Sequence, residues 1–215
     1  MKVFRVHPRD ISRIEIDIPS LDIQRKAISI LDALHNKIIV NNRINDYLEE
    51  SMEVIFRSSF LSQKSYPEVT LDKMIDSMIS GDWGKETPQN DRAVRMRCVR
   101  GTDIPSIDSG GVGKAPLRYI LEKNYEKKKL LAGDIIVEVS GGGPTQSTGR
   151  AALVSSSMLG RHSYPLCCTN FCKAIRPKEE YSLYLSQYWK YMYKRGIMFS
   201  YENGTTGIKN LDLKG

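Results

Sequence analysis

One glycine-rich segment has residue types that could hold a nucleotide phosphate. Residues 109–115 read SGGVGKA, and a lysine that follows spaced glycines is typical of phosphate-binding P-loops. That motif also requires Ser or Thr after the lysine to bind magnesium, and a helix whose N-terminus faces the phosphate. Here Ala115 has no hydroxyl, Pro116 favours a loop, and no hydrophobic strand precedes the segment. The sequence therefore argues against nucleotide hydrolysis.

Two carboxylates on one predicted strand have the residue type of a nuclease site. Asp134 and Glu138 lie four residues apart in DIIVEV, so both side chains point to the same face of the strand. A restriction-type metal site would need a lysine two positions after Glu138, where the chain has Ser140. Carboxylates on a strand are more often solvated or ion-paired than catalytic. We therefore do not expect nuclease chemistry from this pair.

The other reactive residues form no recognisable site. The sequence has no Asn/Asp-Pro-Pro-aromatic segment of a base methyltransferase, and its three histidines (His7, His35, His162) give no Ser-His-Asp set. The four cysteines form no CxxC pair, which predicts reduced, semi-buried cytosolic thiols. The TNF segment at 169–171, between two of these cysteines, reads as strand. We expect no catalytic residue, no metal and no cofactor.

Basic, glycine-rich loops remain, and their residue types suit DNA. They are 81–85 (GDWGK), 100–103 (RGTD), 140–150 (SGGGPTQSTGR) and 204–209 (GTTGIK). Arginine and lysine bind phosphates and guanine edges, whereas Ser, Thr, Gln and Asn bind other base edges. Any one of these loops is as readily a plain turn, but together they favour DNA. The candidate DNA contacts are Trp83, Lys85, Arg100, Thr102, Lys114, Thr145, Ser147, Arg150, Thr205, Thr206 and Lys209.

The net charge of +7 lies entirely in the part of the chain that carries these loops. Residues 1–60 contain nine Lys/Arg and nine Asp/Glu, whereas residues 61–215 contain 23 Lys/Arg and 16 Asp/Glu. A basic domain attracts polyanions such as nucleic acid, although a solvated basic surface is also common. No apolar run approaches the roughly 20 residues of a membrane span, and the N-terminus has no secretory h-region. We therefore expect a cytoplasmic protein without a membrane partner.

A long helix is the first element expected to position this basic part. Residues 21–60 contain no proline or glycine, and apolar residues recur three and four apart in a heptad-like seam, in which Asn41 and Asn45 occupy two slots. About 40 residues give a helix of roughly 60 Å, too long to be covered by its own chain. A second helix, from a partner or another copy, is expected, and the alternative is a hairpin broken near Asn41–Asn42. The seam residues proposed to face the partner are Leu31, Leu34, Ile38, Asn41, Asn45, Leu48, Met52 and Ile55.

The remaining pattern predicts an α+β fold, with this coiled-coil-forming helix followed by a mixed α/β domain. Residues 10–18 alternate like a half-exposed strand, and residues 61–70 read as a linker. Strands are expected at 94–99, 134–139, 150–154 and 171–175, a helix at 181–195 that stops at Gly196, and a turn plus strand at the end. The expected divisions are 1–20, a strand or tail that packs on a recognition domain; 21–62, the helix; and 63–215, the recognition domain.

These residues resemble the specificity subunit of type I restriction-modification systems. The helical region carries IPSLDIQRK (18–26), NNRIN (41–45) and IFRSSF (55–60), similar to that family's conserved spacer helix. GDWGK (81–85), VRGTDI (99–104), GDII (133–136), GR (149–150), TNF (169–171) and TTGIK (205–209) are similar to its target-recognition domain. The likeness covers nearly the whole chain, and the spacer motif is the more specific part.

The resemblance implies a non-catalytic DNA reader. A full subunit of this family has two recognition domains and two conserved helices that pack as an antiparallel coiled coil. Each domain reads half of a bipartite site in double-stranded DNA, and the helix length sets the gap. Separate methyltransferase and restriction subunits dock on this scaffold, and they carry the site-specific adenine methylation and the endonuclease activity.

This chain departs from that pattern because it has one helix and one recognition domain. Residues 10–16 and 208–213 share one alternating pattern, which would fit one period of a repeat. We therefore expect a half-subunit that forms a homodimer through residues 21–60, or pairs with another specificity half. The alternative is a regulatory or decoy half-subunit that acts through protein–protein contacts of the helix.

Overall fold

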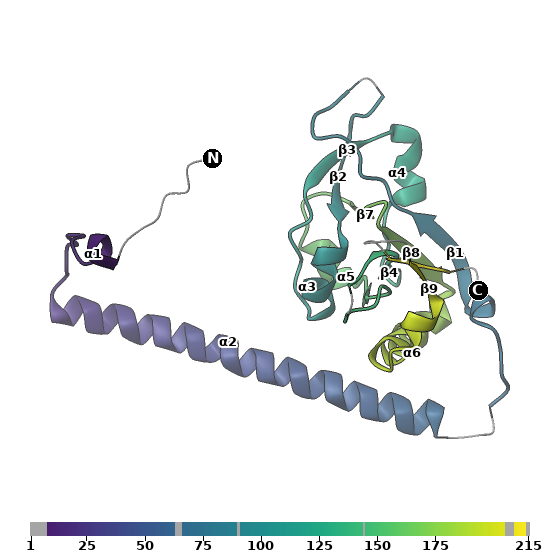
Figure 1. Cartoon of the computed structure of the whole chain (residues 1–215), viewed down its shortest axis with the longest axis horizontal. Coiled ribbons are helices and arrows are strands. Elements are labelled where there is room, and N and C mark those ends of the chain that lie inside the picture. The colour runs from purple at the N-terminus through teal and green to yellow at the C-terminus, as the bar shows by residue number, and fades with distance from the viewer. Residues whose placement is uncertain (1–7, 63–65, 90, 144, 205–208, 214–215) are drawn as a thin grey trace. The chain divides into compact units, whose positions relative to one another are not determined.

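The computed structural model describes residues 8–62, 66–89, 91–143, 145–204 and 209–213, and these residues have the predicted mixed α+β composition. The chain divides into two compact units, Met1–Ser51 and Met52–Gly215. The first unit contains the short helix α1 (Pro8–Ile11) and most of the long helix α2 (Leu21–Phe56), which Figure 1 draws in purple and blue. The second contains the end of α2 and every described strand.

The prediction of a long helix is confirmed. α2 has 36 residues and continues without a break through Asn41 and Asn42, so the alternative of a hairpin is wrong. At 1.5 Å per residue its length is about 54 Å. All the side chains of the proposed seam are exposed: Leu31, Leu34, Ile38, Asn41, Asn45, Leu48, Met52 and Ile55. No helix in the described ranges combines the length and the apolar character needed to cross a bilayer.

The strand predicted at 10–18 is wrong. The segment starts inside helix α1 and then has no regular secondary structure up to α2. Its alternating isoleucines are exposed, Ile16 by 73%. A strand obtains its backbone hydrogen bonds from a neighbouring strand, and none of the described strands pairs with this segment. The predicted packing of residues 1–20 on a recognition domain stays a prediction.

The end of α2 belongs to the second unit, whereas the sequence placed the boundary after residue 62. Phe56 is buried with its ring 5.5 Å from that of Tyr184 and 6.4 Å from that of Tyr188. A π-helical turn, Arg57–Leu61, continues α2 and brings the Phe60 ring within 5.1 Å of Tyr184. Both tyrosines lie on helix α6 (Ser182–Lys194). These ring contacts attach the helix end to the domain, and the one-dimensional pattern did not reveal them.

A four-stranded antiparallel sheet forms the centre of the second unit, in the order β1-β8-β4-β6. The strands are β1 (Ile75–Ser80), β8 (Cys172–Pro177), β4 (Ile135–Glu138) and β6 (Ala151–Leu153). The strands predicted near 134–139, 150–154 and 171–175 are therefore confirmed, while β1 was missed. Its sequence, IDSMIS, mixes polar and apolar residues too irregularly for a clear period of two.

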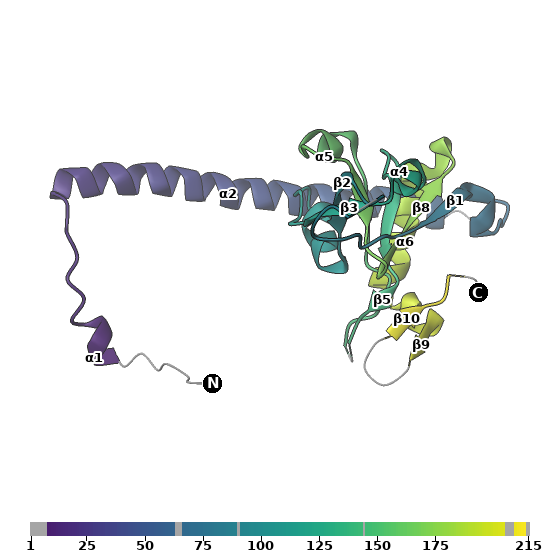
Figure 2. The ribbon, with the colours of Figure 1, turned by 90° about the horizontal axis from the view of Figure 1, so that it is seen from above.

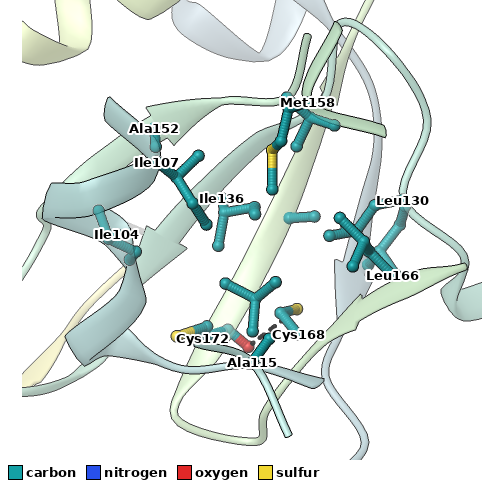
Figure 3. Close-up of a cluster of buried hydrophobic side chains, with 14 residues drawn as sticks. Ile104, Ile107, Ala115, Leu130, Ile136, Ala152, Met158, Leu166, Cys168 and Cys172 are labelled. Carbon is teal, nitrogen blue, oxygen red and sulfur yellow. Dashed lines mark hydrogen bonds between the residues drawn. The ribbon is translucent and has the colours of Figure 1, made fainter. Parts of the chain in front are cut away.

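Both faces of this sheet are covered, which explains the apolar run in β4. Ile136 points to one face, where it packs with α3 (Ile104–Asp108) and α5 (Ser156–Gly160), as Figure 3 shows around Ile104, Ile107 and Met158. Ile135 and Val137 point to the other face, against α6. A strand buried on both faces has no polar alternation. The predicted helix at 181–195 and its end at Gly196, which is left-handed with φ 72°, are confirmed.

Two small sheets complete the second unit. One has the order β3-β2-β7, with β2 (Val94–Val99) antiparallel to β3 (Leu117–Ile120) and parallel to β7 (Leu166–Cys168). The other has the order β5-β10-β9, formed by Ser140–Gly141, Lys209–Leu211 and Glu202–Gly204 (Figure 2). Helix α4 (Glu122–Lys128) follows β3. The predicted strand at 94–99 is confirmed, whereas the TNF segment at 169–171 is the turn from β7 to β8 and not a strand.

Ile136 supplies the test of this packing. Its side chain is 0% exposed in the central strand, so Ile136→Ala should reduce the free energy of unfolding of the second unit by about 2–5 kcal/mol through lost burial and an unfilled cavity. Denaturant unfolding followed by tryptophan fluorescence measures this change, because Trp83 and Trp189 both belong to this unit. Leu183→Ala, at a position 70% exposed, is the control, and an equal loss in both variants would contradict the assignment.

Candidate nucleic-acid interface

An open pocket of about 510 Å³ in the second unit brings several of the predicted loops together. Three predicted DNA contacts line it, Trp83, Arg100 and Thr102. The other lining residues are Gly101, Glu138, Ser140, Thr169, Asn170 and Phe171. The lining residues come from the loop after β1, the turn after β2, the end of β4, the start of β5 and the β7–β8 turn. An aromatic ring, a guanidinium and several hydrogen-bonding groups therefore share one surface depression.

Glu138, which lines this pocket, is buried and forms an ion pair with the partly exposed Arg150. The Arg150 Nε and Nη2 atoms donate to the two Glu138 carboxylate oxygens at 2.8 and 2.7 Å, and the Glu138 side chain is almost completely buried. The Glu138 carboxylate has room only because two neighbouring residues are glycines. A Cβ at Gly101 would lie 2.5 Å from Glu138 Oε1, and a Cβ at Gly141 would lie 2.8 Å from the same atom. Arg150, a predicted DNA contact, is thus engaged within the protein, and its hydrogen bonds with Glu138 raise its pKa.

Ion pairing also argues against a nuclease site at Asp134 and Glu138, the two carboxylates of DIIVEV. Asp134 accepts two hydrogen bonds from Arg176, both at 2.8 Å, and its side chain is buried. Each carboxylate of DIIVEV is therefore neutralised by its own arginine. Across the part of the chain that the structure describes, no group of three or more His, Cys, Asp or Glu side chains could hold a metal ion.

The Asp103 carboxylate links Arg100 to the backbone of Lys114. This carboxylate accepts from Arg100 Nε at 2.9 Å, and from the backbone amides of Arg100 at 3.0 Å and Lys114 at 2.8 Å. Arg100 Nη2 also donates to the Lys114 carbonyl at 3.0 Å. The glycine-rich segment at 109–115 is therefore tied back to the turn after β2, with its lysine side chain exposed. Arg100 has its guanidinium held in place at the pocket rather than free in solvent.

Burial raises the pKa of Asp103, but the hydrogen bonds from Arg100 and from the amides of Lys114 and Arg100 outweigh it. The pKa of this carboxyl therefore lies below its ordinary value. The folded state favours the charged carboxylate more than the unfolded state does. Asp103 therefore stabilises the folded protein above the unfolded pKa of about 3.9. This stabilisation is lost as the pH falls through the folded pKa.

Trp83 is held by a stacked arginine. The Arg118 guanidinium lies 4.0 Å from the centre of the Trp83 ring and donates from Nη1 to Glu86 at 2.7 Å. The backbone of the same loop is fixed by reciprocal hydrogen bonds between Lys85 and Tyr119, each at 2.9 Å. The Lys85 side chain remains exposed. A partly exposed indole fixed in this way is a preformed surface for a base or a deoxyribose.

The other predicted contacts are placed differently. Thr145 is exposed, but Ser147 is only 3% exposed, so its hydroxyl is not available to DNA in this conformation. Its carbonyl instead accepts from the Tyr193 hydroxyl at 3.3 Å. Lys209 pairs with Glu202 at 2.9 Å. Thr205 and Thr206 lie outside the described residues.

The sequence-based prediction of contacts missed six of the nine pocket residues, among them the polar or aromatic residues Ser140, Asn170 and Phe171. Ser140 begins the longest glycine-rich loop. Thr145, Ser147 and Arg150 of this loop were predicted as DNA contacts, whereas Ser140 was not. Asn170 and Phe171 were hidden because TNF was read as strand. The available signal was a polar pair followed by an aromatic residue between two apolar segments, which is also compatible with a turn.

The cysteines are free and buried, rather than semi-buried as expected. Sγ of Cys98 and Sγ of Cys167 lie 3.7 Å apart on the paired strands β2 and β7. This hydrogen bond, followed by burial, strongly raises the pKa of Cys98, and burial strongly raises the pKa of Cys168. Thiols with raised pKa values remain protonated and are poor nucleophiles.

Comparison with known proteins adds a limited likeness. No protein-family model matches the chain, and no curated protein matches it significantly. Among solved structures, the HsdS subunit from Thermoanaerobacter tengcongensis is similar at 14% identity and a TM-score of 0.43, over 83% of this chain and 43% of that one. A chain from a structure on complex assembly and conformational transition of the type I R-M system is similar at 14% identity and a TM-score of 0.44, over 92% of this chain and 49% of that one.

This chain therefore spans less than half the length of either solved structure. The first is an HsdS subunit, and the second comes from a type I R-M system. At 14% identity and TM-scores below 0.5, however, the likeness does not by itself assign a function to this chain.

The buried ion pair gives one test of the pocket. Arg150→Met should reduce the free energy of unfolding of the second unit by about 3–5 kcal/mol, because Glu138 is left as an uncompensated buried charge. Replacing both residues, as Glu138→Leu with Arg150→Met, should restore most of the loss, since no buried charge then remains. Denaturant unfolding of the two variants measures both changes. An Arg150→Met variant as stable as the parent protein would show that the pair does not hold the pocket together.

The lowered pKa of Asp103 gives a second test. The stability difference between the parent protein and Asp103→Asn should be largest at neutral pH and should shrink as the pH falls below about 4. Denaturant unfolding at a series of pH values measures this difference, with Asp91→Asn as the control for loss of an exposed carboxylate. A difference that is constant from pH 7 to pH 3 would contradict the role given to Asp103.

Proposed function

We propose that this chain is a sequence-specific DNA-binding half-subunit of a type I restriction-modification system. In this proposal the second unit reads one half of a bipartite site, and α2 associates with a second helix. The methyltransferase and restriction subunits, which carry the catalysis, dock on the resulting scaffold. One observation carries the proposal. A 36-residue helix with an exposed heptad seam is joined to a domain that holds all of the net positive charge.

The pocket supports the DNA-reading part of the proposal. Trp83 and Arg100 are presented by loops whose backbones are fixed by hydrogen bonds, so little conformational entropy is lost when they bind. Thr102 adds an exposed hydroxyl group that can bind base edges or phosphates, whereas the Ser140 hydroxyl donates to Asn210 and can act only as an acceptor. Exposed Lys85, Lys114 and Thr145 are available around this set for backbone contacts.

The seam supports the partner-binding part. Apolar side chains that are exposed in a row along a helix are costly in water, and burial against a second helix would remove that cost. Asn41 and Asn45 would form polar layers in such a contact, which typically fix the register at some expense in stability. Two copies related by two-fold symmetry would present two reading domains to a palindromic, interrupted site.

Duplex selection tests the DNA-reading function. From a random pool the chain should enrich one short motif on each side of a gap, both with and without the methyltransferase chain. Affinity for the selected duplex should fall about 40-fold between 50 and 200 mM salt if about three phosphates are contacted, because counterions are released on binding. Recovery of no motif would contradict the proposal.

Light scattering tests the helix contact. The parent chain should have twice the monomer mass at micromolar concentration, and Leu34→Glu should shift it to monomer by placing a charge in the seam. Asn36→Glu is the matched control, because two residues along a helix rotate the side chain by about 200°, away from the seam. A monomeric parent chain, or equal effects of the two variants, would contradict association through this seam.

The alternative, a regulatory half-subunit, makes a different prediction in the same experiments. Such a protein would bind a full specificity subunit or a second copy through α2 and would enrich no DNA motif. Dimerisation without motif enrichment would therefore favour the regulatory interpretation over the reader.

A further inference from the structure

We propose that the Asn170–Phe171 tip, the turn between β7 and β8, is the base-reading element of this domain and reads an A·T pair in the major groove. The inference rests on the proposed DNA-binding function and extends it to the recognised bases. It assigns specificity to two residues that the loop composition did not identify.

The backbone of this tip is held from three directions. Thr169 N donates to the Val99 carbonyl at 2.9 Å, and Cys172 N closes the turn onto the Thr169 carbonyl at 2.9 Å. The Phe171 carbonyl accepts two backbone amides, from Val139 at 2.9 Å and Ser140 at 3.1 Å. A turn that is only two residues long at its apex is thus joined to the ends of both β2 and β4. Such a turn presents its side chains without further ordering.

Gly81 completes this support. A Cβ at Gly81 would lie 1.8 Å from the Thr169 carbonyl oxygen and 2.6 Å from the Cys168 carbonyl oxygen, so only glycine allows the loop after β1 to lie directly behind the tip. The next residue, Asp82, donates its amide to the Cys168 carbonyl at 2.8 Å. The loop that carries Trp83 and the tip that carries Phe171 are therefore packed backbone to backbone.

The side chains of the tip are exposed although its backbone is fixed. Phe171 is 58% exposed in a turn between two buried strands. Asn170 is also exposed, and none of the described residues forms a hydrogen bond with its side-chain amide. An apolar ring beside an unused amide contributes little to the stability of the domain, so its placement on a rigid turn is better explained by a ligand.

The chemistry of the two side chains selects the ligand. An asparagine amide can bind adenine through its N6 and N7 atoms in the major groove, and an apolar ring can contact the C5 methyl group of thymine. These groups of an A·T pair lie on the same groove edge. Arg100 and Thr102, which also line the pocket, would then be left for phosphates or a neighbouring guanine.

Single-atom changes in the selected duplex test this reading. Each thymine in the selected motif is replaced in turn by deoxyuridine, which removes only the C5 methyl group, and each adenine by 7-deazaadenine, which removes only the N7 acceptor. The parent protein should lose about 4-fold in affinity at one thymine and about 5-fold at one adenine. Phe171→Ala should be insensitive to that thymine change, and Asn170→Ala should be insensitive to that adenine change, while Leu183→Ala keeps both sensitivities.

The outcomes separate the inference from the proposed function. Without any enriched motif, the DNA-reading function itself fails. An enriched motif without A·T pairs would overturn the inference and leave the function standing. So would an enriched motif at which Phe171→Ala and Asn170→Ala lose as much affinity from the modified bases as the parent protein does.

Discussion

The loops around the pocket meet at one ion pair, between the buried carboxylate of Glu138 and the partly exposed guanidinium of Arg150. Besides the two side-chain hydrogen bonds, the Glu138 amide donates to the Arg150 carbonyl at 2.9 Å, and the Gly149 amide donates to the Glu138 carbonyl at 2.8 Å. The turn after β2 approaches this carboxylate through Gly101. The ends of β2 and β4 and the start of β6 therefore meet around one charge pair. A buried pair is weak evidence for stability, but removal of one partner is costly, so the pair enforces a single arrangement of these loops.

The same kind of constraint applies to three arginines of this domain, whose guanidinium groups are partly exposed but paired with carboxylates of the chain. Arg150 and Arg176 neutralise the two carboxylates of DIIVEV, and Arg100 is held by Asp103. A domain with an excess of positive charge can use some of its arginines to position loops and still present cations to DNA. Exposed Lys85 and Lys114 are then better placed than Arg150 for phosphate contacts. Loops positioned in this way present their exposed side chains to a ligand at little entropic cost.

Much of the fold could be predicted from the sequence because hydrophobic periodicity reports burial directly. The long helix at 21–60, the strand DIIVEV and the helix that ends at Gly196 each have a strong local signal. The strand predicted at 10–18 was wrong because alternation shows that a segment could pair, not that a partner strand is present. The attachment of Phe56 and Phe60 to α6 was missed because residues more than 120 positions apart form it.

The candidate site was less predictable for the same reason. Composition pointed to the loops that carry Trp83, Arg100 and Thr102, and these three residues line one pocket. Composition could not show that Ser147 is buried or that Arg150 is paired. Asn170 and Phe171 were overlooked because the choice between turn and strand at 169–171 depends on hydrogen bonds to distant Val99 and Val139.

The central claim is that this chain discriminates between DNA sequences, and the most direct measurement is a ratio of affinities. The parent protein is titrated with its selected duplex and with a duplex of the same length and composition in scrambled order, at physiological salt. With each mismatched base pair costing about 1–3 kcal/mol, the account predicts a preference of at least about 100-fold for the selected duplex. Equal affinities for the two duplexes would contradict it, because binding would then come from charge alone.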